Sequence, residues 1–454
     1  MLAPEPLAGR ERLGQSVAAV PGILICGSPG FEAQGTDAGG VLVFRLDRYA
    51  RNWLPDPWLT VPGASAGDGF GAVVAASGST LAVGSSSENR VAVFDLNEPA
   101  AAPALLQGGP DFGRSLAIEG DTLVVGEPER AGQPGRGRVT VFRHAPPGEW
   151  ARVQTLGVDT IALNAGFGTS VAMLGDRLLI GAPNALSTGA AFLFTRETSD
   201  GLWSLGAVVQ PANLATGDQF GASVALGDRE LLIGAPASDT SANNAGSVTI
   251  VPIGLATGEL GPPTTVFAPI PATNALFGSA VAARRDLIAI GSPLGDDFAG
   301  EAWVFRRQTD ETFEPAQRLA ANNTEPFAGF GTSVAISDEF IVAGAPQLDA
   351  SPFDPDAGAV AVYETLSALG YTSDCNTNGT DDLVDLFVTR TAADCNGNGR
   401  IDTCEIAANP DLDANGDGVL DGCTADCPAD QNLDGLLTPA DFTTWLLNYN
   451  LGCP

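Results

Sequence analysis

Short apolar runs of two kinds recur along roughly the first 365 residues of the chain. In the stretch FGTSVAMLGDRLLIGAP, Phe167–Pro183, an alternating run is followed by a continuously apolar run, and a Gly-Asp pair separates them. Alternation is typical of a strand with one buried face, and the continuous run is typical of a strand covered on both faces. Because Gly-Asp favours a tight turn, the stretch predicts a β-hairpin.

Close copies of this hairpin recur, for example at Phe220–Pro236 and Phe330–Pro346. The glycine of the Phe-Gly pair, which is Leu13-Gly14 in the first unit, marks seven copies, at Gly14, Gly71, Gly113, Gly168, Gly221, Gly278 and Gly331. Successive copies lie 42 to 57 residues apart. A period near 50 residues is typical of a propeller or a solenoid, in which each unit buries its core against the next.

Each unit carries two further predicted strands. The third strand ends at a large side chain, namely Phe194, Val251, Phe305 or Tyr363 in four of the units. A fourth, more polar strand opens near an aromatic residue, as at Trp150 and Trp203. Small residues near each Phe-Gly pair suit the crowded axis of a ring of sheets. We therefore predict an all-β fold, a seven-bladed β-propeller of four-stranded antiparallel blades; the alternative is an open β-solenoid or sandwich array.

The two ends of this domain are predicted to meet in one sheet. The seventh unit has a weak fourth segment, and the N-terminal Leu7-Ala8 is similar to Leu319-Ala320 in the fourth strand of the sixth unit. An N-terminal strand that completes the last blade would remove a free sheet edge. The expected organisation is a propeller over residues 1–368, a linker over 369–373 and a second module over 374–454.

Charge narrows the choice of partners. The formal net charge is −32, which disfavours nucleic acid and anionic lipid and suits cations. No run of 18 apolar residues occurs, so no membrane span is expected. The chain opens without a basic, apolar leader, so an exported protein would have lost it or carry it upstream. We expect an extracellular or cell-surface location.

Cysteine is concentrated in the C-terminal module. Cys26 lies in an apolar run and is predicted to be a small core residue. The other six are Cys375, Cys395, Cys404, Cys423, Cys427 and Cys453. Six cysteines in a short acidic tail indicate disulfides, with the pairing open. Zinc is the alternative, but there is no CxxC and the one histidine, His144, is remote in sequence.

Four acidic loops in the tail match or approach a calcium-binding pattern, in which oxygen ligands alternate and a terminal carboxylate binds with both oxygens. Two loops match well, with candidate ligands Asp394, Asn396, Asn398, Arg400 (carbonyl) and Glu405, and Asp430, Asn432, Asp434, Leu436 (carbonyl) and Asp441. A third has an acid at its usual apolar position and offers Asp374, Asn376, Asn378, Thr380 (carbonyl) and Asp385. The fourth is denser, with Asp411, Asp413, Asn415, Asp417 and Asp421 in an open register. The expected cofactor is Ca²⁺; the alternative is an acidic linker with Asn-Gly turns.

The spacing of Phe-Gly and Gly-Ala-Pro resembles that of FG-GAP repeats, the units of the integrin α-subunit propeller and of many secreted bacterial proteins. Integrin-type blades often carry a DxDxDG calcium loop after the Gly-Ala-Pro, and none of the corresponding loops here has that spacing. Calcium is therefore not expected in the propeller. Asp296 and Asp297, or Asp354 and Asp356, are alternative cation ligands, although solvated loop acids are the simpler interpretation.

The end of the tail, TPADFTTWLLNYNLGC, resembles a GC-type dockerin module. Phe442, Trp445, Leu446 and Tyr449 form an apolar helical stripe, either packed within the module or offered to a partner. The resemblance implies cohesin binding, surface anchoring or sorting.

Together these features predict a secreted, non-catalytic binding or adhesion protein, with a cell-surface protein or glycan as partner of the propeller. One alternative is a dockerin-borne polysaccharide-active enzyme with two carboxylates on the propeller axis, although no nucleophile motif or carboxylate pair stands out. The other is a structural surface-layer element without a discrete ligand.

Overall fold

The computed structural model divides the chain into two units, Met1–Leu369 and Gly370–Pro454. Its described residues are Leu2, Ile406 and the ranges 10–32, 34–47, 52–85, 87–128, 135–145, 149–197, 201–211, 214–254, 258–308, 310–320, 326–349 and 356–364. The calcium loops, the six tail cysteines and the dockerin-like helix predicted above lie outside these residues. No helix in the described part is long and apolar enough to cross a membrane.

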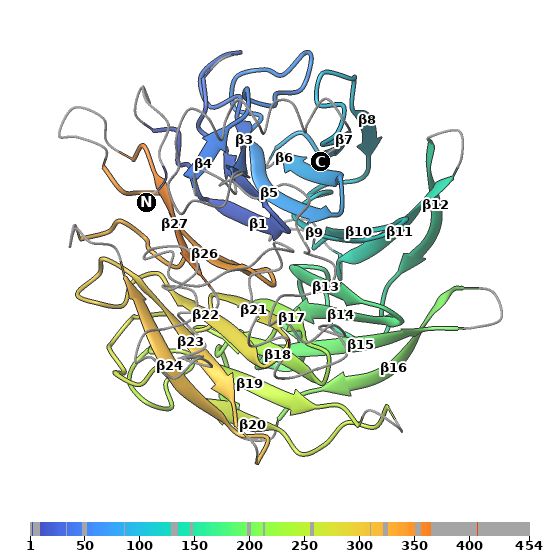
Figure 1. Ribbon diagram of the computed structural model, residues 1–454. Coiled ribbons are helices and arrows are strands. Elements are labelled where there is room, and N and C mark those ends of the chain that lie inside the picture. Colours follow the sequence, from blue (N-terminus) through green and yellow to red (C-terminus); the bar gives the residue numbers. More distant parts are fainter. Residues whose placement is uncertain are drawn as a thin grey trace. The chain divides into compact units, whose positions relative to one another are not determined.

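The described strands form seven antiparallel sheets, one per sequence repeat, arranged as the blades of a propeller (Figure 1). The first blade has β1 (Ser16–Val20), β2 (Ile23–Ser28), β3 (Gly40–Asp47) and β4 (Asn52–Pro55). The second has β5 (Phe70–Ser77), β6 (Thr80–Ser85), β7 (Arg90–Asp95) and β8 (Ala104–Gln107). The third has β9 (Ser115–Glu119), β10 (Thr122–Glu127), β11 (Arg138–Ala145) and β12 (Glu149–Leu156).

The remaining blades repeat this order. The fourth has β13 (Ser170–Leu174), β14 (Arg177–Ala182), β15 (Ala190–Arg196) and β16 (Trp203–Val209), with a short 3-10 helix η1 (Ala185–Ser187) before β15. The fifth has β17 (Ser223–Leu226), β18 (Glu230–Ala235), β19 (Ser247–Pro252) and β20 (Thr264–Val266). The sixth has β21 (Ala280–Arg284), β22 (Leu287–Ser292), β23 (Glu301–Arg307) and β24 (Phe313–Ala320). The seventh has β25 (Ser333–Ile336), β26 (Phe340–Ala345) and β27 (Ala359–Glu364). The predicted all-β, seven-bladed architecture is confirmed.

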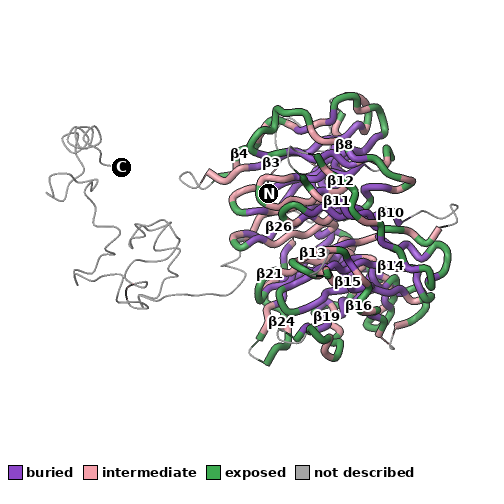
Figure 2. The backbone as a smooth tube through the Cα atoms, turned by 90° about the vertical axis from the view of Figure 1, so that its right-hand side faces the viewer, coloured by how far each residue is buried: buried purple, intermediate pink, exposed green. Residues whose placement is uncertain are grey.

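The hydrophobic pattern explains the layering within a blade. The second strand of each hairpin is almost wholly buried, as in β10, whereas the outer strand β12 is mostly exposed (Figure 2). In the hairpin of the fourth blade, Val171 pairs with Ile180 and Ala172 with Leu179. The continuously apolar runs therefore mark the strands covered on both faces, as predicted.

The core lies between neighbouring blades. Phe167, which precedes the fourth blade, is fully buried and packs in one cluster with Val124 and Val139 of the third blade and Ile180 and Phe192 of the fourth. Comparable clusters fill the other spaces, for example around Phe330 between the sixth and seventh blades. Cys26 is buried in the cluster between the seventh and first blades, and burial raises the pKa of its thiol. Each blade is therefore stabilised mainly by its neighbours.

The first and last blades are in contact, so the ring is closed. Leu13 forms a parallel bridge with Gly358, in the same way that Phe277 does with Gly246 and Phe330 with Gly300. In addition, Leu2 forms an antiparallel bridge with Val360 of β27. The Leu2 N–H donates to the Val360 carbonyl at 2.7 Å. Leu7 and Ala8, on which the predicted closing strand rests, lie outside the described residues.

Candidate functional site

The glycines of the two repeated motifs face each other between blades. A Cβ on Gly234, the Gly-Ala-Pro glycine of the fifth blade, would collide with the carbonyl oxygen of Gly278, the Phe-Gly glycine of the sixth. The same opposition joins the other blades in the pairs Gly27 and Gly71, Gly84 and Gly113, Gly126 and Gly168, Gly181 and Gly221, Gly291 and Gly331, and Gly344 and Gly14. Only glycine leaves room for this approach, so both motifs act as joints.

A serine hydroxyl closes five of these joints. The Ser223 hydroxyl donates a hydrogen bond to the Gly278 carbonyl at 2.6 Å, and Ser333 makes the same bond to Gly14 across the closing joint at 2.8 Å. Ser16, Ser115 and Ser170 make the equivalent bonds. Val73 and Ala280 occupy the position in the other two blades. The repeated residues are thus engaged in holding the ring, and a ligand site must use other side chains.

The innermost strands offer little catalytic chemistry. They are β1, β5, β9, β13, β17, β21 and β25, which contact one another around the ring. Glu119, the one carboxylate on these seven strands, accepts a hydrogen bond from the Gly175 N–H at 2.7 Å. Arg284, at the end of β21, forms a two-point ion pair with Asp338 at 2.8 and 2.9 Å. This hydrogen bond from Arg284 lowers the pKa of Asp338. The polar groups here therefore join adjacent blades.

Of the four loop acids considered as cation ligands, Asp296 and Asp356 have partners within the propeller. Asp296 forms an ion pair with Arg318 at 2.6 Å, while Asp356 donates its backbone N–H to the Asp349 carboxylate at 2.9 Å. Asp297 is exposed, and Asp354 lies outside the described residues. Among the residues that the structure describes, no three His, Cys, Asp or Glu side chains are grouped closely enough to hold a metal ion.

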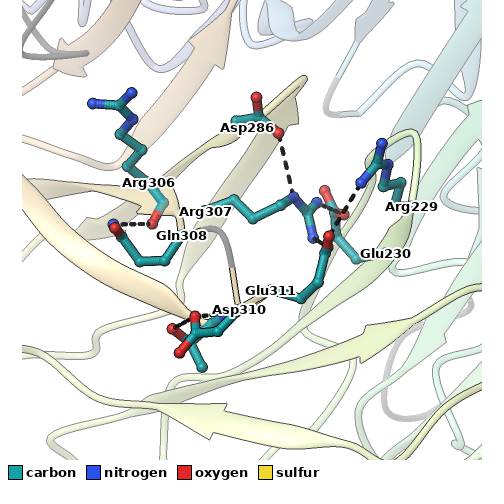
Figure 3. Close-up of polar contacts among 9 residues, drawn as sticks. Arg229, Glu230, Asp286, Arg306, Arg307, Gln308, Asp310 and Glu311 are labelled. Atoms are coloured by element: carbon teal, nitrogen blue, oxygen red, sulfur yellow. Dashed lines mark hydrogen bonds and ion pairs between the residues drawn. The ribbon is translucent and has the colours of Figure 1, made fainter.

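An ion-pair cluster centred on the buried Glu230 and Arg307 joins the fifth and sixth blades (Figure 3). The Arg307 guanidinium contacts the Glu230 carboxylate, lies 3.1 Å from Glu311 and 3.4 Å from Asp286, and stacks over Phe313 with 4.7 Å to the ring centroid. Arg229 adds a contact to Glu311 at 3.2 Å.

Burial raises the pKa of Glu230, more strongly than Arg307 lowers it. The Glu230 side chain is 0% exposed, and its Oε1 atom has no hydrogen-bond partner among the described residues. Groups with perturbed pKa values are candidates for function, but ion-pair networks perturb them too. Since this buried carboxylate of the fifth blade is paired with Arg307 of the sixth, the cluster serves to connect two blades.

The most conspicuous exposed feature is an aromatic pair that the sequence analysis missed. Phe298 and Phe327, from the loops that meet before the seventh blade, stack with ring centroids 5.5 Å apart and an interplanar angle of 24°. They are 42% and 63% exposed. Aligning the repeats on their glycines would have revealed them, because Asn244 and Asn274 occupy the same two positions one blade earlier.

All twenty candidate calcium ligands, from Asp374 to Asp441, lie outside the described residues, so the four calcium loops stay a prediction. The same holds for the tail disulfides and for the dockerin-like helix.

Comparison with known proteins identifies the repeat. A family model described as FG-GAP repeat matches residues 203–251 and 313–363. Each match runs from the outer strand of one blade to the third strand of the next, so it spans one joint. A search of curated proteins finds no match to the chain. The chain therefore contains FG-GAP repeats, and these build a seven-bladed β-propeller.

Proposed function

We propose that this protein is an extracellular or cell-surface binding and adhesion protein without catalytic activity. The observation that supports this best is that the repeated residues of the propeller form the joints between blades, while the loops beside them differ in sequence from blade to blade. At one such loop position the blades carry Asp37, Ser187, Asn244, Phe298 and Asp356. A constant frame with variable loops is typical of a recognition scaffold. FG-GAP repeats are also typical of extracellular and surface proteins.

The strong negative charge limits the partner. A net charge of −32 opposes nucleic acid and anionic membranes and favours a protein or glycan that carries neutral or basic groups. The test is to immobilise the full chain and measure binding to a glycan array and to cells in the presence of calcium. We expect saturable binding without change to the ligand. Release of shortened polysaccharide would contradict this proposal and favour the enzyme.

The C-terminal module is proposed to anchor or assemble the protein through calcium. Its clustered carboxylates repel one another until a cation neutralises them, so ion binding and folding are coupled there. Anchoring through a cohesin-like partner follows from the dockerin resemblance.

Replacing Glu405 by Gln should remove one high-affinity calcium event, because the loop loses its two-oxygen carboxylate ligand. Calorimetric titration of the full chain with CaCl₂ measures this loss. Asp356→Asn in the propeller is the control and should leave the number of events unchanged. Loss of an event in the control, and not in Glu405→Gln, would place calcium in the propeller instead.

A further inference from the structure

The two exposed phenylalanines occupy backbone positions that are costly for them. Phe298 and Phe327 have φ values of 74° and 68°, in the left-handed region that bulky side chains avoid. The position of Phe327 is taken by Gly67, Asn164, Gly217 and Asn274 in other blades, with Gly or Asn tolerating this conformation. Asp296 and Asp297, which precede Phe298, are left-handed as well.

Burial does not offset this cost, because Phe298 and Phe327 remain 42% and 63% exposed. The backbone geometry is maintained without them: Phe327 donates its N–H to the Phe298 carbonyl, and Gly217 makes the same bond to Ser187 two blades earlier. Residues that are exposed, have a strained backbone and are not required for the loop conformation are candidates for ligand contact.

The surroundings of the pair favour a cation. The faces of aromatic rings carry negative potential and attract ammonium and guanidinium groups. Asp297 is exposed beside Phe298, and no described residue pairs with it. Arg318, on β24 of the same blade, is held by Asp296 at 2.6 Å and by Glu301 at 2.5 Å. The loop thus keeps a net negative charge around the two rings.

The same charge argues against other occupants. A second copy of this chain also carries a net charge of −32, which opposes its approach, and an anionic ligand would be repelled by Asp297. We propose that Phe298, Phe327 and Asp297 form a docking site for an arginine or lysine side chain of a basic partner protein. This inference rests on the proposed binding function and assigns it a place on the propeller.

The test uses the full chain and a fluorescein-labelled peptide, Gly-Ser-Arg-Gly-Arg-Ser-Gly, with fluorescence anisotropy as readout. A peptide with citrulline in place of both arginines keeps the shape and removes the charge. The double variant Phe298→Asn/Phe327→Asn copies the residues at the same positions one blade earlier, Asn244 and Asn274. The Asn244 side-chain N–H donates a hydrogen bond to the Asn274 side-chain oxygen at 3.1 Å. The double variant is therefore expected to fold, and its melting temperature tests this. Its net charge equals that of the wild type.

We expect the arginine peptide to bind the wild type about fivefold more tightly than the double variant, as for a cation over two exposed rings. Asp297→Asn should weaken binding too, while Ile270→Ala, which removes an equally exposed apolar side chain (63%), should not.

Three results with the peptides would overturn this site: no saturable binding to the wild type, equal binding by the double variant, or equal binding of the citrulline peptide. A fourth is a double variant that loses binding to neutral glycans but still binds the arginine peptide as the wild type does. The glycan and cell-binding assays above test the proposed function without assuming that the two rings take part. A propeller that binds cells equally well with and without them would keep its proposed function and lose this site.

Discussion

Gly234 illustrates how one missing side chain lets two blades meet. Its Cα faces the Gly278 carbonyl of the next blade, and the Ser223 hydroxyl bonds to the same oxygen at 2.6 Å. A methyl group at Gly234 would meet backbone, which cannot move aside as the end of a flexible side chain can.

Gly234→Ala should therefore lower the free energy of unfolding by about 1–3 kcal/mol, the usual range for overpacking. Urea unfolding followed by circular dichroism measures the change. Gly157→Ala is the matched control, since a Cβ there meets nothing within 4 Å, and it should be neutral or slightly stabilising. Equal stability of the two variants would show that the joint tolerates a side chain.

At the scale of strands, the Glu230–Arg307 pair ties β18 of the fifth blade to β23 of the sixth. Because burial raises the pKa of Glu230, the folded chain holds this proton more tightly than the unfolded chain does. The contribution of Glu230 to stability should therefore fall as the pH rises from its ordinary pKa of 4.5 through the raised value.

The measurement is the free energy of unfolding of wild type and Glu230→Gln at a series of pH values. The stability of the wild type relative to this variant should decrease with rising pH. Asp338 gives the opposite case: its pKa is lowered from 3.8, so its contribution is present above 3.8 and is lost as the pH falls through the lowered value. A pH-independent difference for Glu230→Gln would mean that Glu230 is equally protonated in both states.

The sequence predicts a feature well when that feature depends on residues close together in the chain, and poorly when it depends on residues far apart. Each hairpin is specified locally by its alternating run, turn and continuous run, so β13 and β14 were predictable within a few residues. The Glu230–Arg307 contact joins residues 77 apart and depends on how two blades are offset, which no local pattern shows. Aligning the repeats on their glycines singles out Phe298 and Phe327 as unusual residues, but their stacking and their left-handed backbone are visible only in the structure.

At the scale of the whole molecule, the seven joints form a closed cycle. The joint between the last and first blades uses the same groups as the others: Gly344 faces the Gly14 carbonyl, and Ser333 bonds to that oxygen at 2.8 Å. In an open array the first and last units have no contact with each other, whereas in a closed ring they are neighbours like any other pair. The proposal that the propeller holds its variable loops in fixed positions depends on this closure.

The most direct test of closure is hydrogen exchange, followed by mass spectrometry, in the Gly344→Ala variant of the full chain. Because the substitution lies in the seventh blade and its partner Gly14 precedes the first, a closed ring predicts faster exchange in both β26 and β1, far apart in sequence. Faster exchange in the seventh blade alone, with β1 unchanged, would contradict the closed ring.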